Sequence, residues 1–240
     1  MDKDIINILI IIYLILIIFL IIFILYESYD YYKYYRTLEV DGYKVFMKFD
    51  TKQILNELPD GYGFINYKYQ IKGCSLSTFH RDVTSSQTIF KTKYPVYTCI
   101  TYKNTGDLLT ICPASHKTTP FLFERPLIIR GNKNTTILFN CDIIHAGAIN
   151  KFGNNRHAIQ FKLCHKDDLK KLKHLIGIDK ISIGKCNNSW IYEYVLRKIS
   201  LLYPFFFNHV LTKLLQERPE KDSMIELIIN KFYIGDFYNS

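Results

Sequence analysis

Residues 135–163, TTILFNCDIIHAGAINKFGNNRHAIQFKL, indicate the fold most directly, because they place two apolar runs on either side of a polar turn. Thr, Ile and Phe are frequent in both runs, and each run has about the length of a β-strand. The intervening INKFGNN, residues 149–155, is rich in the turn residues Gly and Asn. We therefore expect two adjacent antiparallel strands, with His145 at the end of the first and Arg156 at the start of the second.

Short apolar runs of the same kind lie upstream of this stretch. They are YPVYTCITY (94–102), LLTICP (108–113) and PLIIRG (126–131). Earlier still come TLEVDGYKVFMKF (37–49), read as strand, turn and strand, the short helix TKQILNEL (51–58), and the extended GYGFINYKYQIKG (61–73). Many short strands at regular spacing indicate a sandwich, a barrel or a jelly roll.

The pattern changes after Lys166, where apolar residues recur at three- and four-residue spacing. Three stretches have this helical period: DDLKKLKHLIGI (167–178), SWIYEYVLRKISLLY (189–203) and FNHVLTKLLQERP (207–219). A β core followed by segregated helices predicts the α+β class. The expected units are an anchor with its linker (1–36), a β core (37–165) and a C-terminal helical extension (166–240).

The N-terminal segment is long and almost purely apolar. From Ile5 to Tyr26 it contains no charged residue, and as a helix it is long enough for a hydrocarbon core of roughly 30 Å. A cleavable signal peptide has a shorter apolar region and a small-residue cleavage site. We therefore predict a single-pass membrane anchor through residues 5–26. The flanking charges do not decide on which side of the membrane the remaining chain lies.

The net charge of +9 raises the question of nucleic-acid binding. The basic residues are spread along the chain, and their one cluster, residues 166–173, contains Asp167 and Asp168. A solvated helix face explains this cluster, so we expect no nucleic-acid partner. The six cysteines form no CxxC pair, which argues against structural zinc and leaves disulfides and oligomeric state open.

The most informative short motif is FHRDV, residues 79–83. On an extended chain, residues two apart point to the same side, so His80 and Asp82 can face one metal ion. A distant second histidine, His145, would complete a facial triad of two histidines and one carboxylate, the ligand set of non-haem iron(II) oxygenases. A second His-x-Asp at His165 and Asp167 has no matching sequel, and we interpret it as the start of a surface helix.

These residues resemble the motifs of the 2-oxoglutarate/iron(II) oxygenase superfamily, specifically its phytanoyl-CoA dioxygenase-like branch. The resemblance covers roughly residues 60 to 165. It rests on His80-x-Asp82, on the approach Asn104-Thr105-Gly106-Asp107-Leu108, on the turn Cys112-Pro113-Ala114-Ser115-His116-Lys117, and on His145…Asn150…Arg156. In that turn, Ala114 replaces the usual glycine.

The resemblance implies a double-stranded β-helix, a jelly-roll or cupin-like core. It also implies iron(II) held by His80, Asp82 and His145, 2-oxoglutarate as co-substrate with its distal carboxylate on Arg156, and ascorbate as a further candidate. No catalytic residue beyond the metal ligands is implied, and His116 takes a structural or pocket role. Gly147 stands where the family often has Ser or Thr. Tyr97, Thr101 and Lys91 are unranked candidates for that second co-substrate contact.

The expected function is a dioxygenase that hydroxylates a C–H bond of a lipid, a small molecule or a protein side chain. The alternative is a catalytically inactive jelly-roll module, binding or structural, tethered to a membrane. A third reading is an assembly protein whose C-terminal helices bind partners. Iron content and turnover of 2-oxoglutarate to succinate separate the first two readings, and truncation after residue 169 addresses the third. The substrate is not decided by the sequence.

Overall fold

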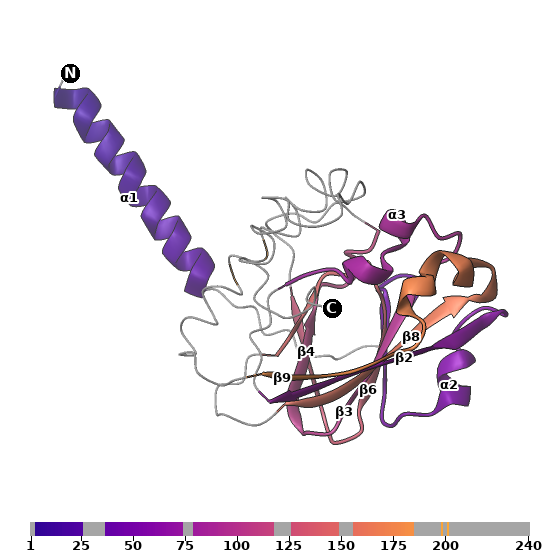
Figure 1. Ribbon diagram of the computed structural model, residues 1–240. Helices are drawn as coiled ribbons and strands as arrows, with labels where there is room; N and C mark the ends of the chain where they lie inside the picture. The colour runs from indigo at the N-terminus through magenta and orange to yellow at the C-terminus, as the bar shows by residue number, and fades with distance from the viewer. Residues whose placement is uncertain are drawn as a thin grey trace.

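The computed structural model describes residues 3–25, 37–73, 79–117, 126–148, 156–184, 198 and 201. Within this part of the chain the strands form two sheets (Figure 1). The six-stranded sheet has the order β1 (Tyr43–Phe46), β6 (Thr136–Asn140), β3 (Tyr97–Tyr102), β8 (His157–His165), β2 (Tyr62–Gly73) and β9 (Ile178–Gly184). The three-stranded sheet has the order β5 (Leu127–Gly131), β4 (Gly106–Ile111) and β7 (His145–Gly147).

The two sheets face each other across a shared apolar core. Along β3, alternate residues point to opposite faces, so Ile100 and Tyr102 point inward while Tyr97 and Cys99 point outward. The core between the sheets comprises Tyr43, Ile100, Tyr102, Leu108, Leu109, Ile111, Leu127, Ile129, Ile137, Phe139, Ile143 and Ala158. The domain is therefore of the α+β class and has a jelly-roll-like core that includes a mixed sheet. The many short strands expected from the sequence agree with this architecture.

The outer face of the six-stranded sheet is covered by α2 (Thr51–Leu55). Asp50 caps this helix by accepting from the backbone N–H of Lys52 and of Gln53, at 3.0 and 3.1 Å. Ile54 packs with the outward residues of the sheet. The strand predicted before the turn at Asp41-Gly42 is absent, because residues 38–41 are themselves turns and only β1 follows.

The stretch from Thr136 to His145 is divided between the two sheets. β6 ends at Asn140, whose side-chain oxygen accepts from the backbone N–H of Asp142 at 2.9 Å, and the chain then crosses to β7. β7 pairs with β4, whereas β8 pairs with β3 and β2. The prediction that His145 and Arg156 lie on adjacent antiparallel strands is therefore wrong, because a turn within the apolar run moves His145 into the other sheet.

The sheet continues beyond the boundary expected at residue 165. Residues Lys166–Leu175 form a 3₁₀ helix with one kink, and β9 then adds in parallel to β2. Of the two later helical stretches, only Lys198 and Leu201 lie among the described residues. Leu201 packs with the outer face of the three-stranded sheet, in a cluster with Phe79, Cys112, Ile144 and Ala146.

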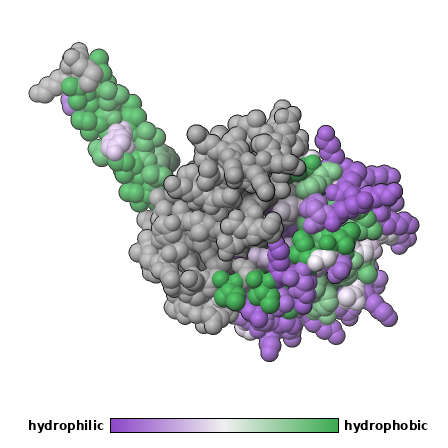
Figure 2. Space-filling model, in the orientation of Figure 1, coloured by the Kyte–Doolittle hydropathy of each residue, from purple (hydrophilic) through white to green (hydrophobic). Residues whose placement is uncertain are grey.

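The N-terminal helix α1 (Lys3–Leu25) stands apart from the sheets (Figure 1). None of the apolar window Asp4–Ile22 is buried, and Figure 2 shows hydrophobic side chains along the helix, in contrast to the mixed surface of the β domain. By length and composition it can cross a membrane, and a signal sequence near an N-terminus would have the same properties. Among the described residues the cysteines are free and buried: Cys99, Cys112, Cys141 and Cys164.

Candidate metal centre

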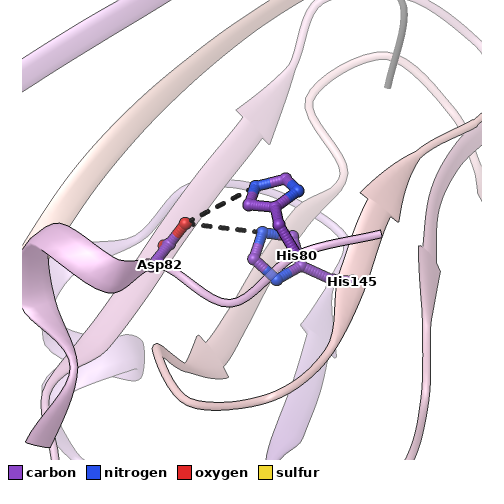
Figure 3. A group of neighbouring side chains, drawn as sticks. All are labelled: His80, Asp82 and His145. Atoms are coloured by element: carbon purple, nitrogen blue, oxygen red, sulfur yellow. Dashed lines mark ion pairs between the residues drawn. The ribbon is translucent and has the colours of Figure 1, made fainter. Parts of the chain in front are cut away.

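His80, Asp82 and His145 converge at one point between the sheets (Figure 3). The segment around His80 lies antiparallel to the crossover. His80 and His145 exchange backbone hydrogen bonds of 2.9 and 3.0 Å, and the Asp82 N–H donates to the Cys141 carbonyl at 2.9 Å. One ligand atom from each of the three side chains lies within 4.8 Å of the others. Backbone pairing of two distant segments therefore fixes where the three side chains meet.

The three ligand atoms suit a divalent transition metal. Asp82 Oδ1 lies 3.8 Å from His80 Nε2 and 3.6 Å from His145 Nε2. In an octahedral site with bonds of about 2.1 Å, neighbouring ligand atoms lie about 3 Å apart, so only a small contraction is needed. The His145 Nδ1 atom lies 3.0 Å from the Ile143 carbonyl oxygen, to which it can donate a hydrogen bond. In that tautomer the lone pair of Nε2 is available to a metal. The donor set and its spacing fit iron(II).

Burial and charge hold these side chains in the protonation states that bind metals. Burial, and then the neighbouring His80, lower the pKa of His145 to about 3, so its imidazole is neutral at physiological pH. Burial opposes ionisation of Asp82, but Lys162 and then the two histidines hold the pKa of this carboxyl well below its usual range. The site therefore offers a neutral imidazole at His145 and a carboxylate at Asp82, the forms that a metal requires of these ligands.

Lys162, which was not predicted from the sequence, lies on the inner face of β8 and is 1% exposed. Its Nζ donates to Asp82 Oδ2 at 2.6 Å, to Thr98 Oγ1 at 2.7 Å and to Ser85 Oγ at 2.8 Å, and lies 3.6 Å from Cys141 Sγ. A lysine inside the apolar run HAIQFKL is the sequence signal that could have found it, since lysine is rarely buried without a partner.

The turn Cys112–Lys117 supports both ligand segments from outside the site. Arg81, between two of the proposed ligands, donates through Nη2 to the Ser115 carbonyl at 2.8 Å. The Ser115 hydroxyl accepts from the backbone N–H of Ile144, next to His145, at 2.8 Å. Ala114 has a positive φ of 61°, a conformation that glycine adopts at lower cost. His116 lies against Gly42 and is not part of the triad, consistent with a structural role.

Arg156 is brought to the inner side of the site although it precedes a strand of the other sheet. A Cβ atom on Gly147 would lie 1.9 Å from Arg156 Nη1, so the guanidinium occupies the space that a side chain at 147 would need. A residue larger than glycine at position 147 would therefore require the guanidinium to move. Within the described residues, Arg156 Nε is buried and has no hydrogen-bond partner.

Tyr102, which was not predicted from the sequence, lies beside Arg156. The Arg156 Cζ atom lies 5.9 Å from the centroid of its ring. Burial raises the pKa of the Tyr102 hydroxyl, against the opposing effect of Arg156, so the group is a neutral donor. Two of the expected candidates lie elsewhere: Thr101 bonds to Thr136 on the outer face, and Lys91 is exposed at the end of α3 (Gln87–Phe90).

Tyr97 and His165 lie outside the candidate metal centre. Tyr97 points to the outer face and belongs to the cluster under α2. His165 caps the 3₁₀ helix, accepting from the Asp167 N–H at 3.3 Å, and packs between Tyr62 and Tyr94. The second His-x-Asp is therefore a helix start, as predicted, although its histidine is buried rather than on the surface.

No protein-family model and no curated protein matches this chain. Among solved structures, EvdMO1 matches with a TM-score of 0.37 at 12% identity, over 48% of this chain and 30% of that one. The nickel complex of the non-haem monooxygenase ThoJ matches with a TM-score of 0.39 at 8% identity, over 48% of this chain and 49% of that one. Apo HygX from Streptomyces hygroscopicus matches with a TM-score of 0.40 at 12% identity, over 54% and 84%. The matched region thus spans less than half of EvdMO1 and about half of ThoJ.

Proposed function

We propose that this chain is an iron(II)- and 2-oxoglutarate-dependent oxygenase. The observation that carries the proposal is the convergence of two imidazole Nε2 atoms and one carboxylate oxygen, from His80, His145 and Asp82, on one point inside a jelly-roll-like core. These three side chains would hold the ion and leave other coordination positions free for further ligands. When bound there, iron(II) would supply the positions at which the keto acid of the co-substrate and O₂ bind.

The residues of this chain would orient the co-substrate. Arg156 offers a planar, permanently charged guanidinium for the distal carboxylate, and the neutral hydroxyl of Tyr102 offers a second donor beside it. Gly147 leaves the guanidinium its space. The ring of Phe139, whose centroid lies 4.5 Å from that of His145, would shield this side of the site from water and so strengthen these charge interactions.

The reaction balances with one O₂ for each substrate. One oxygen atom enters the succinate formed as 2-oxoglutarate loses CO₂, and the other enters a C–H bond of the substrate. The proposed substrates are a lipid, a small molecule or a protein side chain. We also propose that α1 is a single-pass anchor, because a fully exposed apolar helix would be unfavourable in water. The anchor would confine the reaction to substrates at a membrane.

The test uses the full chain in detergent micelles with iron(II), 2-oxoglutarate and O₂. We expect succinate release that depends on iron(II), and a mass gain of one oxygen atom in a lipid extract or in co-expressed membrane proteins. His80→Ala and His145→Ala should abolish both. Binding of iron(II) without succinate from any candidate substrate would instead support a catalytically inactive binding module. A chain that binds no divalent metal would contradict the proposal.

The anchor is tested separately. Extraction of membranes at alkaline pH should leave the chain in the membrane fraction, and mass spectrometry should find residues 1–25 still attached. Recovery of a soluble chain that lacks these residues would show that α1 is a cleaved signal sequence.

A further inference from the structure

Lys162 is a buried ammonium group whose closest carboxylate belongs to the proposed metal site. Its side chain lies between the sheets, where an uncompensated charge is unfavourable. Three oxygen atoms, from Asp82, Thr98 and Ser85, lie within 2.8 Å of Nζ. Three hydrogen bonds satisfy all the donors of an ammonium, so the group is held in one position.

The two oxygen atoms of the Asp82 carboxylate have different surroundings. Oδ2 accepts from Lys162 and from the Thr98 hydroxyl, at 2.6 and 2.5 Å. Oδ1 faces the Nε2 atoms of His80 and His145. The carboxylate can therefore give one oxygen to a metal while the other remains bonded to the ammonium.

This arrangement changes the charge of the site. Two neutral imidazoles and one carboxylate would carry a charge of −1, but the ammonium of Lys162 cancels it. The two other buried carboxylates of the described residues bond to groups outside the proposed ligand set: Asp142 accepts from the Ser86 hydroxyl and the Gln87 N–H, and Asp168 accepts from the N–H groups of Lys93 and Tyr94. Arg156 adds a further positive charge on the inner side.

We propose that Lys162 couples metal loading to the anionic co-substrate. The inference rests on the metal centre proposed above. With Lys162 present, a divalent ion alone meets a ligand set without net negative charge and is bound weakly. A dianion that chelates the ion compensates the excess positive charge, so ion and dianion bind more tightly together than either does alone. Lys162 is thus a positioning residue: it acts through Asp82 and does not touch the reacting atoms.

The experiment measures binding of Co²⁺ to the full chain in detergent, by calorimetry, with and without saturating oxalate as the chelating dianion. Lys162→Gln keeps an N–H donor for Asp82 but removes the charge, whereas Lys162→Met removes both. We expect both variants to bind Co²⁺ alone ten- to a hundredfold more tightly, and oxalate to improve that binding at least tenfold less than in the wild type. Lys72→Gln, at an exposed position of β2, is the matched control and should change neither value.

The outcomes separate the two proposals. Co²⁺ that does not bind the wild type, with or without oxalate, would overturn the metal centre itself. In another outcome, Lys162→Gln binds Co²⁺ with the affinity of the wild type while Lys162→Met binds it more weakly. That result would show that the lysine only orients the carboxylate, and it would overturn the proposed coupling. If neither variant folds, the coupling is tested on the wild-type protein by comparing two chelators. Oxalate should then strengthen Co²⁺ binding at least tenfold more than the monoanionic chelator acetohydroxamate, after correction for their affinities for the free ion, and equal strengthening would refute the inference.

Discussion

Replacement of Gly147 by alanine tests the role of Arg156 without changing any charged group. The added Cβ would lie 1.9 Å from Nη1 and 2.5 Å from Cζ of Arg156, so the guanidinium must move. Gly147 is not among the residues with positive φ, and the atoms it would meet belong to a flexible side chain. A displaced rotamer costs about 1 kcal/mol of stability, so the protein should still fold.

The loss should appear in the affinity for 2-oxoglutarate. A hydrogen bond to a charged group contributes about 1.5–3 kcal/mol, which corresponds to a roughly 10- to 150-fold higher dissociation constant. Calorimetry under nitrogen, with Co²⁺ in place of iron, measures this constant while binding of the metal alone stays unchanged. Arg156→Ala should give a loss at least as large.

Gly63→Ala is the matched control for this prediction. Gly63 also lies in a strand, but a Cβ there meets nothing within 4 Å. It should leave 2-oxoglutarate binding unaltered. If the Gly147 variant is folded and its dependence on 2-oxoglutarate equals that of the wild type, Arg156 does not hold the co-substrate and the reasoning fails.

Three further predictions concern metal binding and stability. His145→Ala should abolish Co²⁺ retention while circular dichroism shows an intact β core, and full retention would contradict the assignment. Because the pKa of His145 falls from 6.5 to about 3 on folding, the metal-free protein should lose stability as pH decreases from 6.5 towards 3, by about 2 kcal/mol between pH 7 and pH 5. Urea unfolding measures this loss, and His145→Gln should reduce it. Ala114→Gly should stabilise the protein by up to about 1 kcal/mol, because Ala114 has φ 61°, and a decrease in urea midpoint would argue against strain there.

The sequence was informative where a local pattern determines local structure. The runs at 94–102 and 157–163 became β3 and β8, because β-branched and aromatic residues of strand length have few alternatives when buried. The crossover at Cys141–Ile143 was missed, because Asn140 and Asp142 signal a break in the apolar run but not whether the chain then changes sheet. β9 was missed for a related reason: its partner β2 lies about a hundred residues earlier, so pairing rather than propensity makes it a strand.

The candidate site shows the same division. His80 and Asp82 could be predicted from the sequence, because residues two apart on an extended chain point to the same side. His145 could be predicted because the resembling motifs occur in a fixed order along the sequence. Lys162 could not be predicted, because its role depends on its position opposite Thr98 on the neighbouring strand. The tertiary structure sets that register. Tyr102 is a similar case, one tyrosine among 19 until the fold places it beside Arg156.

The hydrogen bonds around the site indicate that its three ligands are held in place before any metal binds. His80 and His145 are joined by reciprocal backbone hydrogen bonds, and the turn at Ser115 is bonded to the residue next to each of them. Asp82 is held from the opposite side by Lys162. Ligands fixed in this way need little reorganisation when an ion enters, so the ion meets a rigid set whose charge rather than flexibility limits its affinity. Removing Lys162 should therefore change the affinity for the metal through charge.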